Sequence, residues 1–505
     1  MNDGQIIVTT TGVVILPYSE GQSKQLEYET SRYDKIYHKA IPTTGFYNEK
    51  LEAFATYKMS PYKLKEFFPS YDVVYHKNYM GKTMADFSMT VELNRYQDDA
   101  ISQLIGLKKH EAYVNIPTAS GKTVLAVAYS CMLKKKTFIM CYSSKILEQW
   151  EKTFETKTTM NSSRIMELSS SKQMNGILIG KVDVRDIDVF LCTGSLLDMF
   201  GKQYGYEKIH PLFMEMSIGL KIIDEAHTRL GTTIRCNAYT SIDKTLYLSA
   251  DYNQADNLKF RQFKSVFMTV PIIRLRDELM NELKHITATV WSFNSHPGMD
   301  DLLRVTSNKY GWSNMEYCRY EFENRPIKDA LVTLLKYIWQ NDISISPNGK
   351  PYKILILTQL IEHVDLIYDI VNKMELKGRN VSKFYSTLES AEKEFALDAD
   401  IIVSTYKSFS TGIDVTSPQI RHVISTCPVD VVTANQSAGR CRPIPGMQSY
   451  FWLLSDYGFD HCPRNIEKVL KYLKQNKIGN VKRMHYENDE IRDVSTNNAF
   501  EEKTT

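Results

Sequence analysis

The segment AYVNIPTASGKTVLAVAYS, residues 112–130, limits the fold strongly because it joins two apolar runs through a short polar loop. Residues 112–116 predict a buried strand, and residues 124–128 begin an apolar helical stretch. A loop in this place wraps backbone N–H groups around phosphates at a helix N-terminus, where the dipole favours an anion. The segment therefore predicts an α/β unit with a site for a nucleotide phosphate.

The loop matches the general phosphate-loop pattern G-x-x-x-x-G-K-[ST] only in part. Ile116 stands where the first glycine is required, and only Gly121, Lys122 and Thr123 fit. In the functional interpretation, Lys122 contacts the β- and γ-phosphates and Thr123 ligates Mg²⁺. The alternative is an ordinary strand-to-helix turn, and this motif by itself leaves both interpretations open.

An acidic pair follows a second apolar run in GLKIIDEAHTRLG, residues 219–231. Residues 220–223 predict a strand that ends at Asp224 and Glu225, which is where a parallel sheet places its catalytic groups. Asp224 can hold Mg²⁺ and Glu225 can orient the attacking water, although acidic pairs are also common surface caps. Strand and helix patterns alternate between the two motifs, in KTFIMCYSS, KILEQWEKTF and DVFLCTGSLLDMF, and predict a doubly wound parallel sheet.

Together, PTASGKT and the DEAH box resemble the nucleotide-binding motifs of superfamily-two helicases, whose loop does not need the upstream glycine. Further segments resemble that family's remaining motifs in order, from about Leu93 to about Leu454. These segments are LNRYQDDAISQL, TFIMCYSSKILEQW, LCTGSLL, YLSAD, KILILTQLIEHVDLI, IIVSTYKSFSTGIDV and NQSAGRCRP.

The resemblance implies roles for individual residues. The nucleotide-binding residues that it implies are Gln97, which contacts the adenine, and Thr118, Ser120, Gly121, Lys122, Thr123, Gly412 and Asp414. The residues that it implies for contact with one nucleic-acid strand are Ser143, Ser144, Lys145, Thr193, Ser195 and Thr411. The residues that couple hydrolysis to movement are His227, Ser249 and Gln436. The catalytic residues that the resemblance implies are Lys122, Glu225, Arg440 and Arg442. The residues that it implies as ligands of Mg²⁺ are Thr123 and Asp224.

Three positions depart from the family pattern. Ala119 replaces a usual glycine, at a cost of order 1 kcal/mol if the backbone needs positive φ there. Asp251 replaces a threonine in the coupling motif. Arg440 and Arg442 are one residue closer than in G-R-x-x-R, and residues two apart do not share a helix face. We expect Arg440 to reach the γ-phosphate, with Arg442 as the alternative.

Composition narrows the remaining classes of protein. The 505 residues are 43% hydrophobic and 24% charged, as in globular proteins of two to four domains. The eight cysteines form no C-x-x-C pair, which predicts a reducing compartment and no zinc site. The N-terminus lacks a basic leader and no apolar stretch is long enough to span a membrane. We therefore expect a soluble cytoplasmic protein, in the host cytoplasm if it is viral.

The expected architecture is α/β, with two tandem RecA-like doubly wound parallel-sheet domains and a small β-rich N-terminal accessory domain. The predicted ranges are 1–90 for the accessory domain, 91–270 for the ATP-binding motor domain, 271–462 for the second motor domain, and 463–505 for a basic helix and disordered tail. In the accessory domain, tyrosines alternate with lysines over residues 57–82, which suits either nucleic-acid stacking or the packing of a small sheet. In the C-terminal helix, Ile466, Val469, Leu470 and Leu473 share one face, and Lys468, Lys471 and Lys474 lie off it.

The layout of a short N-terminal module before a compact motor is most similar to the UvsW-like branch-migration helicases of large phages and their poxvirus-type relatives. This resemblance implies an ATP- and Mg²⁺-dependent helicase or translocase, monomeric, that acts on forks, R-loops or recombination intermediates in DNA replication, recombination or repair. Two alternatives stay open: an RNA-directed helicase or transcript-release ATPase, and a nucleic-acid-binding scaffold with a weak ATPase site.

Overall fold

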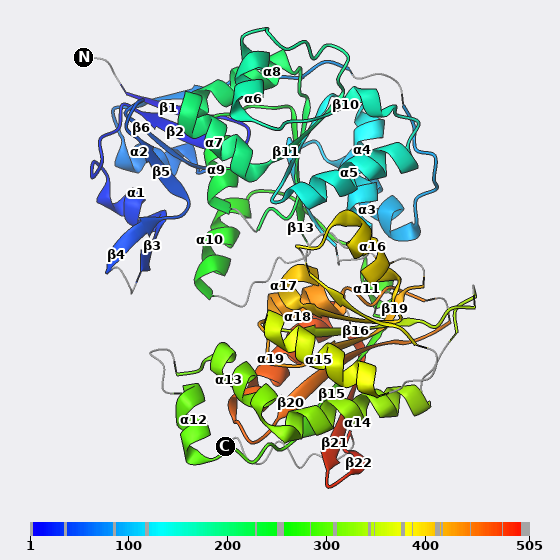
Figure 1. Ribbon diagram of the computed structural model, residues 1–505. Coiled ribbons are helices and arrows are strands. Elements are labelled where there is room, and N and C mark those ends of the chain that lie inside the picture. Colours follow the sequence, from blue (N-terminus) through cyan, green and yellow to red (C-terminus); the bar gives the residue numbers. More distant parts are fainter. Residues whose placement is uncertain are drawn as a thin grey trace. The chain divides into compact units, whose positions relative to one another are not determined.

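The computed structural model describes residues 4–34, 38–83, 87–116, 121–227, 230–249, 257–282, 284–306, 311–341, 345–347, 349–374, 379–385, 387–409, 415, 418–444, 446–476 and 478–495. It divides into two compact units, Met1–Arg276 and Asp277–Thr505, and each contains its own large, mainly parallel sheet (Figure 1). The predicted fold class, two tandem RecA-like α/β domains with a β-rich N-terminal part, is confirmed.

The main sheet of the first unit has seven strands in the order β10-β11-β9-β12-β13-β8-β14, and all neighbouring strands are parallel. The strands are β8 (Glu111–Asn115), β9 (Thr137–Cys141), β10 (Ile165–Glu167), β11 (Val189–Thr193), β12 (Leu220–Ile223), β13 (Lys244–Ser249) and β14 (Ile272–Ile273). Because helices lie on both sides, the central strands are buried along most of their length and are mainly apolar (Figure 1). The strands predicted at 112–116 and 220–223 are therefore confirmed.

The helices of the motor part of this unit follow the strands in alternation. They are α3 (Arg95–Gly106), α4 (Lys122–Leu133), α5 (Ser144–Lys157), α6 (Ser171–Leu178), α7 (Gly194–Tyr204), α8 (Ile209–Glu215), α9 (Leu230–Ala238) and α10 (Asn257–Phe267).

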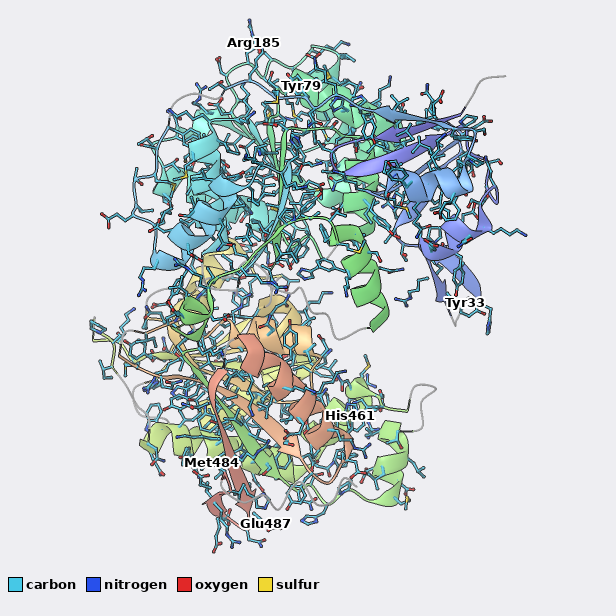
Figure 2. The ribbon with its side chains drawn as sticks, turned by 180° about the vertical axis from the view of Figure 1, so that it is seen from behind. Tyr33, Tyr79, Arg185, His461, Met484 and Glu487 are labelled. Carbon is cyan, nitrogen blue, oxygen red and sulfur yellow. The ribbon has the colours of Figure 1, made fainter. Side chains whose placement is uncertain are left out.

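A second sheet of the first unit is built from the N-terminal residues, in the order β5-β6-β2-β1-β7. Its strands are β1 (Gln5–Val8), β2 (Gly12–Leu16), β5 (Gly45–Asn48), β6 (Ala53–Tyr57) and β7 (Asp72–Tyr75). The N-terminal part also contains two helices, α1 (Lys24–Glu29) and α2 (Pro61–Phe67), and a separate hairpin of β3 (Ser31–Asp34) and β4 (Lys39–Pro42). Tyr33 lies on this hairpin, at the outer end of the N-terminal part (Figure 2).

The N-terminal sheet packs directly on α9 of the motor part, through β2, β5 and β6. Gly12 is required at this contact, because a Cβ there would lie 2.6 Å from the Cα of Ala238. The hydroxyl of Thr11 donates to the carbonyl of Asn237 at 2.9 Å. Helix α10 adds a contact in which Gln262 Nε2 donates to the hydroxyl of Thr43 at 2.5 Å. The N-terminal sheet and the first motor sheet therefore belong to one compact unit.

The second unit has eight strands in the order β17-β18-β16-β19-β20-β15-β21-β22, antiparallel only between β21 and β22. The strands are β15 (Ile286–Phe293), β16 (Lys353–Thr358), β17 (Val381–Phe384), β18 (Ile401–Thr405), β19 (Ile420–Ser425), β20 (Ser449–Asp456), β21 (Ile478–Glu487) and β22 (Glu490–Asp493). The helices are α11 (Asp277–Glu282), α12 (Met299–Thr306), α13 (Asn314–Glu323), α14 (Arg325–Asn341), α15 (Ile361–Lys373), α16 (Ser390–Asp398), α17 (Tyr406–Phe409), α18 (Val431–Ala438) and α19 (His461–Asn476).

The C-terminal end of the chain differs in part from our expectation. Helix α19 is present, and its predicted apolar face is buried in the core of the second unit. Within the range 463–505, for which we expect only a basic helix and a disordered tail, residues 478–487 and 490–493 instead form β21 and β22, which extend the sheet beside β15. Only Ile478 and Met484 are buried along β21, so its sequence shows little of the alternation of apolar and polar residues that predicts a strand. Met484 and Glu487, both on this strand, are labelled in Figure 2.

The side chains also bear on the compositional predictions. All eight cysteines are free and buried. Among the described residues, no group of histidine, cysteine and acidic side chains is arranged to hold a metal ion by itself. A search of the same residues finds no helix with the length and apolarity to cross a membrane.

Candidate active site

The phosphate-loop motif leads directly into helix α4. Gly121 is the N-cap of this helix and has φ 80° and ψ 40°, in the left-handed region that glycine adopts without strain. A Cβ at this position would also lie 2.3 Å from Nε2 of Gln97. Glycine is therefore required here on two counts. Residues 117–120, which include Thr118, Ala119 and Ser120, lie outside the described part of the chain.

Lys122 begins α4 and acts electrostatically on Asp224, although the two residues are 102 positions apart in the sequence. Asp224 follows β12, and its backbone N–H donates to the carbonyl of Met140 on the neighbouring β9. Nζ of Lys122 donates to the carbonyl of Ile116 at 3.3 Å, across the mouth of the loop. The fold therefore brings the cation of the loop and the first carboxylate of the acidic pair to one place.

The environment of Asp224 opposes a bare negative charge. Burial and, to a smaller extent, the neighbouring charge of Glu225 raise the pKa of Asp224 to about 6. A hydrogen bond from the indole of Trp150 and the charge of Lys122 act in the opposite direction. A nearby cation would stabilise the charged form of this carboxylate, because its charge offsets the cost of burial and the repulsion from Glu225.

Glu225 has a left-handed backbone, with φ 46°, which is uncommon for a residue other than glycine. Its backbone N–H donates to Oδ1 of Asp224 at 2.9 Å, so the pair is held together locally. The Glu225 side chain is only partly buried. Asp224 and Glu225 are therefore both half-buried, next to each other.

His227 connects the acidic pair to the next strand of the sheet. Its Nδ1 and the hydroxyl of Ser249 form a hydrogen bond of 2.6 Å, and Oε2 of Glu225 lies 3.4 Å from the same nitrogen. Ser249 ends β13, beside β12, and is fully buried. Two of the residues predicted to couple hydrolysis to movement are therefore in direct contact. Asp251 lies outside the described residues.

Gln97 is held against the phosphate loop. It is the third residue of a capping box at the start of α3, where its Oε1 accepts the N–H of Asn94 at 2.9 Å. Its Nε2 donates to the carbonyl of Gly121 at 3.2 Å. In this structure the amide of Gln97 therefore supports the loop, whereas its predicted contact with adenine stays a prediction.

The five residues of the first unit that are predicted to contact a nucleic-acid strand gather at one edge of its sheet. Ser143 and Thr193 are the N-caps of α5 and α7, which follow the neighbouring parallel strands β9 and β11. The hydroxyl of Thr193 caps its own helix by accepting the N–H of Leu196. Ser144 and Lys145 start α5, and Ser195 lies in the first turn of α7. The two predicted strand contacts are thus adjacent in space.

The arginines of the last motif lie in the second unit, just beyond α18. This helix ends at Ala438, so Arg440 and Arg442 are not on a helix, and the argument from helix faces does not apply to them. The guanidinium of Arg440 lies 6.0 Å from the ring centroid of Phe409. Gln436 is half-buried on α18. Thr411, Gly412 and Asp414 lie outside the described residues.

The alternating tyrosines and lysines of residues 57–82 are partly engaged in packing. Lys63 forms an ion pair with Glu29, and Lys65 donates to the backbone carbonyl of Tyr71. Tyr62 and Tyr75, in contrast, are 87% and 70% exposed. The structural interpretation holds for these two lysines, while the two exposed tyrosines remain candidates for stacking.

Comparison with known proteins agrees with this geometry. A family model described as "Type III restriction enzyme, res subunit" matches residues 90–254, which hold the loop and the acidic pair. A protein of Acanthamoeba polyphaga mimivirus named "Putative ATP-dependent RNA helicase L396" is 22% identical over 306 residues, 59% of this chain and 51% of its own length. The transcription and DNA repair factor IIH helicase/translocase subunit XPB of Enterocytozoon bieneusi is 23% identical over 144 residues, 28% of this chain and 24% of its own length. The chain is therefore similar in sequence to proteins that are named as helicases and helicase/translocases.

The chain spans about half, or less, of the length of these curated relatives. Among solved structures, the helicase domain of Hef from Pyrococcus furiosus has a TM-score of 0.47 and 14% identity, over 74% of this chain and 97% of that domain.

Thr123 and Asp224 suit the Mg²⁺ that accompanies ATP in such helicases, because a hydroxyl and a carboxylate supply the oxygen ligands that this ion prefers. The raised pKa of Asp224 fits the same conclusion, since a cation would stabilise its charged form.

We did not predict the role of Trp150, which donates to Asp224 at 3.0 Å. Its only sequence signal is its place on the apolar face of α5, with Leu147 and Phe154, which is also the signal of an ordinary core residue.

Proposed function

We propose that this helicase hydrolyses ATP to move along one strand of DNA, and that it acts on branched DNA such as forks, R-loops and recombination intermediates. Replication, recombination or repair of DNA is the process that uses such an activity. The observation that carries the proposal is the convergence of Lys122, Asp224 and Glu225 in the first unit.

Each of these residues has a role in phosphoryl transfer, which depends on positioning and charge stabilisation. Lys122 neutralises charge on the β- and γ-phosphates. Glu225, whose side chain is partly exposed, orients the attacking water and accepts its proton. Arg440 stabilises charge that develops on the transferred phosphoryl group, with Arg442 as the alternative. Thr123 and Asp224 would hold Mg²⁺, which supplies further charge neutralisation when bound.

Movement requires that the nucleotide site and the strand contacts communicate. The hydrogen bond between His227 and Ser249 links the acidic pair to β13, so a change at Glu225 reaches the neighbouring strand. Ser143, Ser144, Lys145, Thr193 and Ser195 supply hydroxyl, backbone and ammonium groups at the end of the same sheet. Such groups bind phosphates and do not depend on base sequence.

An RNA substrate is the second candidate, because contacts to phosphates distinguish the two sugars poorly. It is favoured by the name of the mimivirus relative, which is called an RNA helicase. A scaffold with an inactive site is the third candidate, and it is opposed by the presence of Lys122, Asp224, Glu225 and Arg440.

The ATPase rate of the purified full chain tests these candidates directly. It is measured with forked DNA, single-stranded DNA, duplex DNA and single-stranded RNA at equal nucleotide concentration and constant salt. The proposal expects the greatest stimulation by forked DNA. Greater stimulation by RNA would favour the second candidate, and no turnover with any of these would favour the scaffold.

A further inference from the structure

A pocket of about 330 Å³ lies in the first unit, between the N-terminal sheet and the motor helices. One wall comes from β5 and the turn after it, and the other from the end of α7, the short 3₁₀ helix Tyr206–Lys208 and the end of α9. This volume is at the lower end of the range found for small-molecule pockets. None of its residues belongs to the nucleotide site or to the strand contacts described above.

Aromatic side chains dominate the walls of this pocket. They are Phe46, Tyr47, Tyr204, Tyr206 and Tyr239. The rings of Tyr206 and Tyr239 are nearly parallel, at an interplanar angle of 19° with centroids 6.0 Å apart. The guanidinium of Arg235 lies over the opposite ring of Phe46, 4.4 Å from its centroid. Flat rings and a flat guanidinium favour a flat ligand that can stack on them.

Asp198 holds the polar part of the pocket in place from behind. Its Oδ1 accepts hydrogen bonds from the hydroxyl of Tyr206 at 2.7 Å and from Nε of Arg235 at 2.8 Å. Its Oδ2 pairs with Nζ of Lys202 at 2.8 Å. Because one carboxylate fixes three side chains, the orientation of the tyrosine and of the guanidinium is set before any ligand arrives.

The charged and polar side chains around the pocket indicate which kind of flat ligand could bind in it. Lys50 and Lys202 lie on its exposed rim, while Glu49 and Glu207 balance them, so the lining does not select a strongly anionic ligand. Asn48 adds an amide that can donate and accept hydrogen bonds. A neutral heterocycle with a polar edge, attached to a single phosphate near the lysines, matches this arrangement.

We propose that this pocket binds one unpaired nucleobase of the nucleic-acid strand on which the helicase acts. The proposal rests on the proposed function, and it adds a site that lies apart from the motor's strand contacts. Helix α7 supports it by its position, because it starts at the predicted strand contact Thr193–Ser195 and ends at Tyr204 in the pocket wall. A strand that leaves the motor contact along α7 would reach the pocket after on the order of 15 Å.

Photo-crosslinking with the full chain tests the proposal. A single-stranded oligonucleotide that carries 5-iodouracil is bound and irradiated, and the crosslinked peptides are mapped by mass spectrometry. Binding affinity for the same oligonucleotide is measured for the wild type and for Tyr204→Leu, Tyr204→Phe and Lys50→Ala. Lys181→Ala is the control, because it removes the same charge from an exposed position outside the pocket.

The proposal expects crosslinks at Tyr204, Tyr206 or Tyr239. It also expects about tenfold weaker binding for Tyr204→Leu, since a stacked base contributes of that order. Tyr204→Phe keeps the ring and should bind like the wild type. Lys50→Ala should weaken binding of the oligonucleotide more than Lys181→Ala does. If Tyr204→Leu does not fold, the binding of Lys50→Ala and the crosslinks together test whether the pocket binds a base.

Crosslinks confined to other residues, with unchanged binding by Tyr204→Leu and Lys50→Ala, would overturn the pocket assignment and leave the proposed function intact. That result would point to a different occupant, such as an aromatic side chain of a partner protein. Absence of any nucleic-acid binding by the wild type would instead overturn the proposed function, and this inference with it.

Discussion

The indole N–H of Trp150 donates a hydrogen bond of 3.0 Å to Oδ2 of Asp224. Trp150 lies on α5, is fully buried, and comes from a segment otherwise associated with strand contact. The bond therefore joins the helix that starts at the strand contact to the carboxylate that would hold Mg²⁺.

Replacement of this tryptophan tests its importance for the metal. Trp150→Phe keeps an aromatic ring at this position but removes the N–H that stabilises the charged form of Asp224. The affinity of Asp224 for Mg²⁺ should therefore fall. A hydrogen bond to a charged group contributes about 1.5–3 kcal/mol. We expect the Mg²⁺ concentration for half-maximal ATPase to rise roughly tenfold or more. A titration of ATPase rate against Mg²⁺ measures this shift, and an unchanged midpoint in a folded variant would contradict the positioning role.

The catalytic roles of the loop and the acidic pair are separable by two substitutions. Lys122→Ala should abolish ATP turnover, because it removes the cation that faces the phosphates. Glu225→Gln should bind ATP normally and fail to hydrolyse it, because the amide cannot accept the proton of the water. Fluorescent ATP binding and phosphate release measure the two steps. Lys152→Ala, on an exposed position of α5, is the matched control, and wild-type hydrolysis by Glu225→Gln would refute its assignment.

The two arginines after α18 are compared in the same assay. Arg440→Ala should lower kcat by roughly 10³-fold with little change in ATP affinity, as expected of a group that acts on the transition state. Arg442→Ala should have a smaller effect. If the large loss belongs to Arg442→Ala, the register assigned to this motif is wrong.

The exposed tyrosine of α2 provides a clean test of the N-terminal part in branch recognition. Tyr62→Ala should leave stability within about 0.5 kcal/mol, since 87% of the residue is exposed. If Tyr62 stacks on unpaired bases at a junction, the variant should lose part of its preference for forks over single strands. Tyr62→Phe should retain that preference. If wild type and Tyr62→Ala prefer forks over single strands to the same extent, Tyr62 has no part in branch recognition.

The stability of the first unit should depend on pH through His210. Burial and, to a smaller extent, the neighbouring charges of His76 and Lys221 lower the pKa of His210 to about 4. Its ring contacts His76 and Tyr79, and its Nδ1 accepts the backbone N–H of Ser241 at 3.5 Å.

Because the folded state binds the proton less well than the unfolded state, stability is complete above about pH 6.5. It is lost as pH falls toward 4. Between pH 7.5 and 5, urea unfolding should show a loss of about 2 kcal/mol in the wild type that is absent from His210→Gln. Equal pH dependence in both proteins would show that other groups dominate.

Much of the first motor sheet could be predicted because its strands are buried on both faces. Leu220–Ile223 and Thr137–Cys141 are mostly apolar and are buried at every position, and each is followed by a polar segment that starts the next connection. Strand β21 could not be found in this way, because a strand with only two buried residues carries almost no periodic signal.

For the candidate site, sequence order was enough to pair Lys122 with Asp224, since both follow strands of one parallel sheet. The support from Trp150 depends on where α5 crosses the sheet, and Gln97 reaches Gly121 only because a capping box turns its side chain inward. Contacts of this kind are set by tertiary packing, and neither residue type nor spacing reveals them.

Helix α9 begins shortly after His227, and its far end carries the N-terminal sheet through Ala238 and Asn237. The N-terminal sheet is therefore not an exchangeable cassette. A homologous sheet grafted onto this motor would have to present a glycine opposite Ala238 and a hydroxyl opposite the carbonyl of Asn237, or it would displace the helix that follows the acidic pair. Chimaeras that exchange the sheet and α9 as one piece should retain ATPase activity more often than chimaeras that exchange the sheet alone.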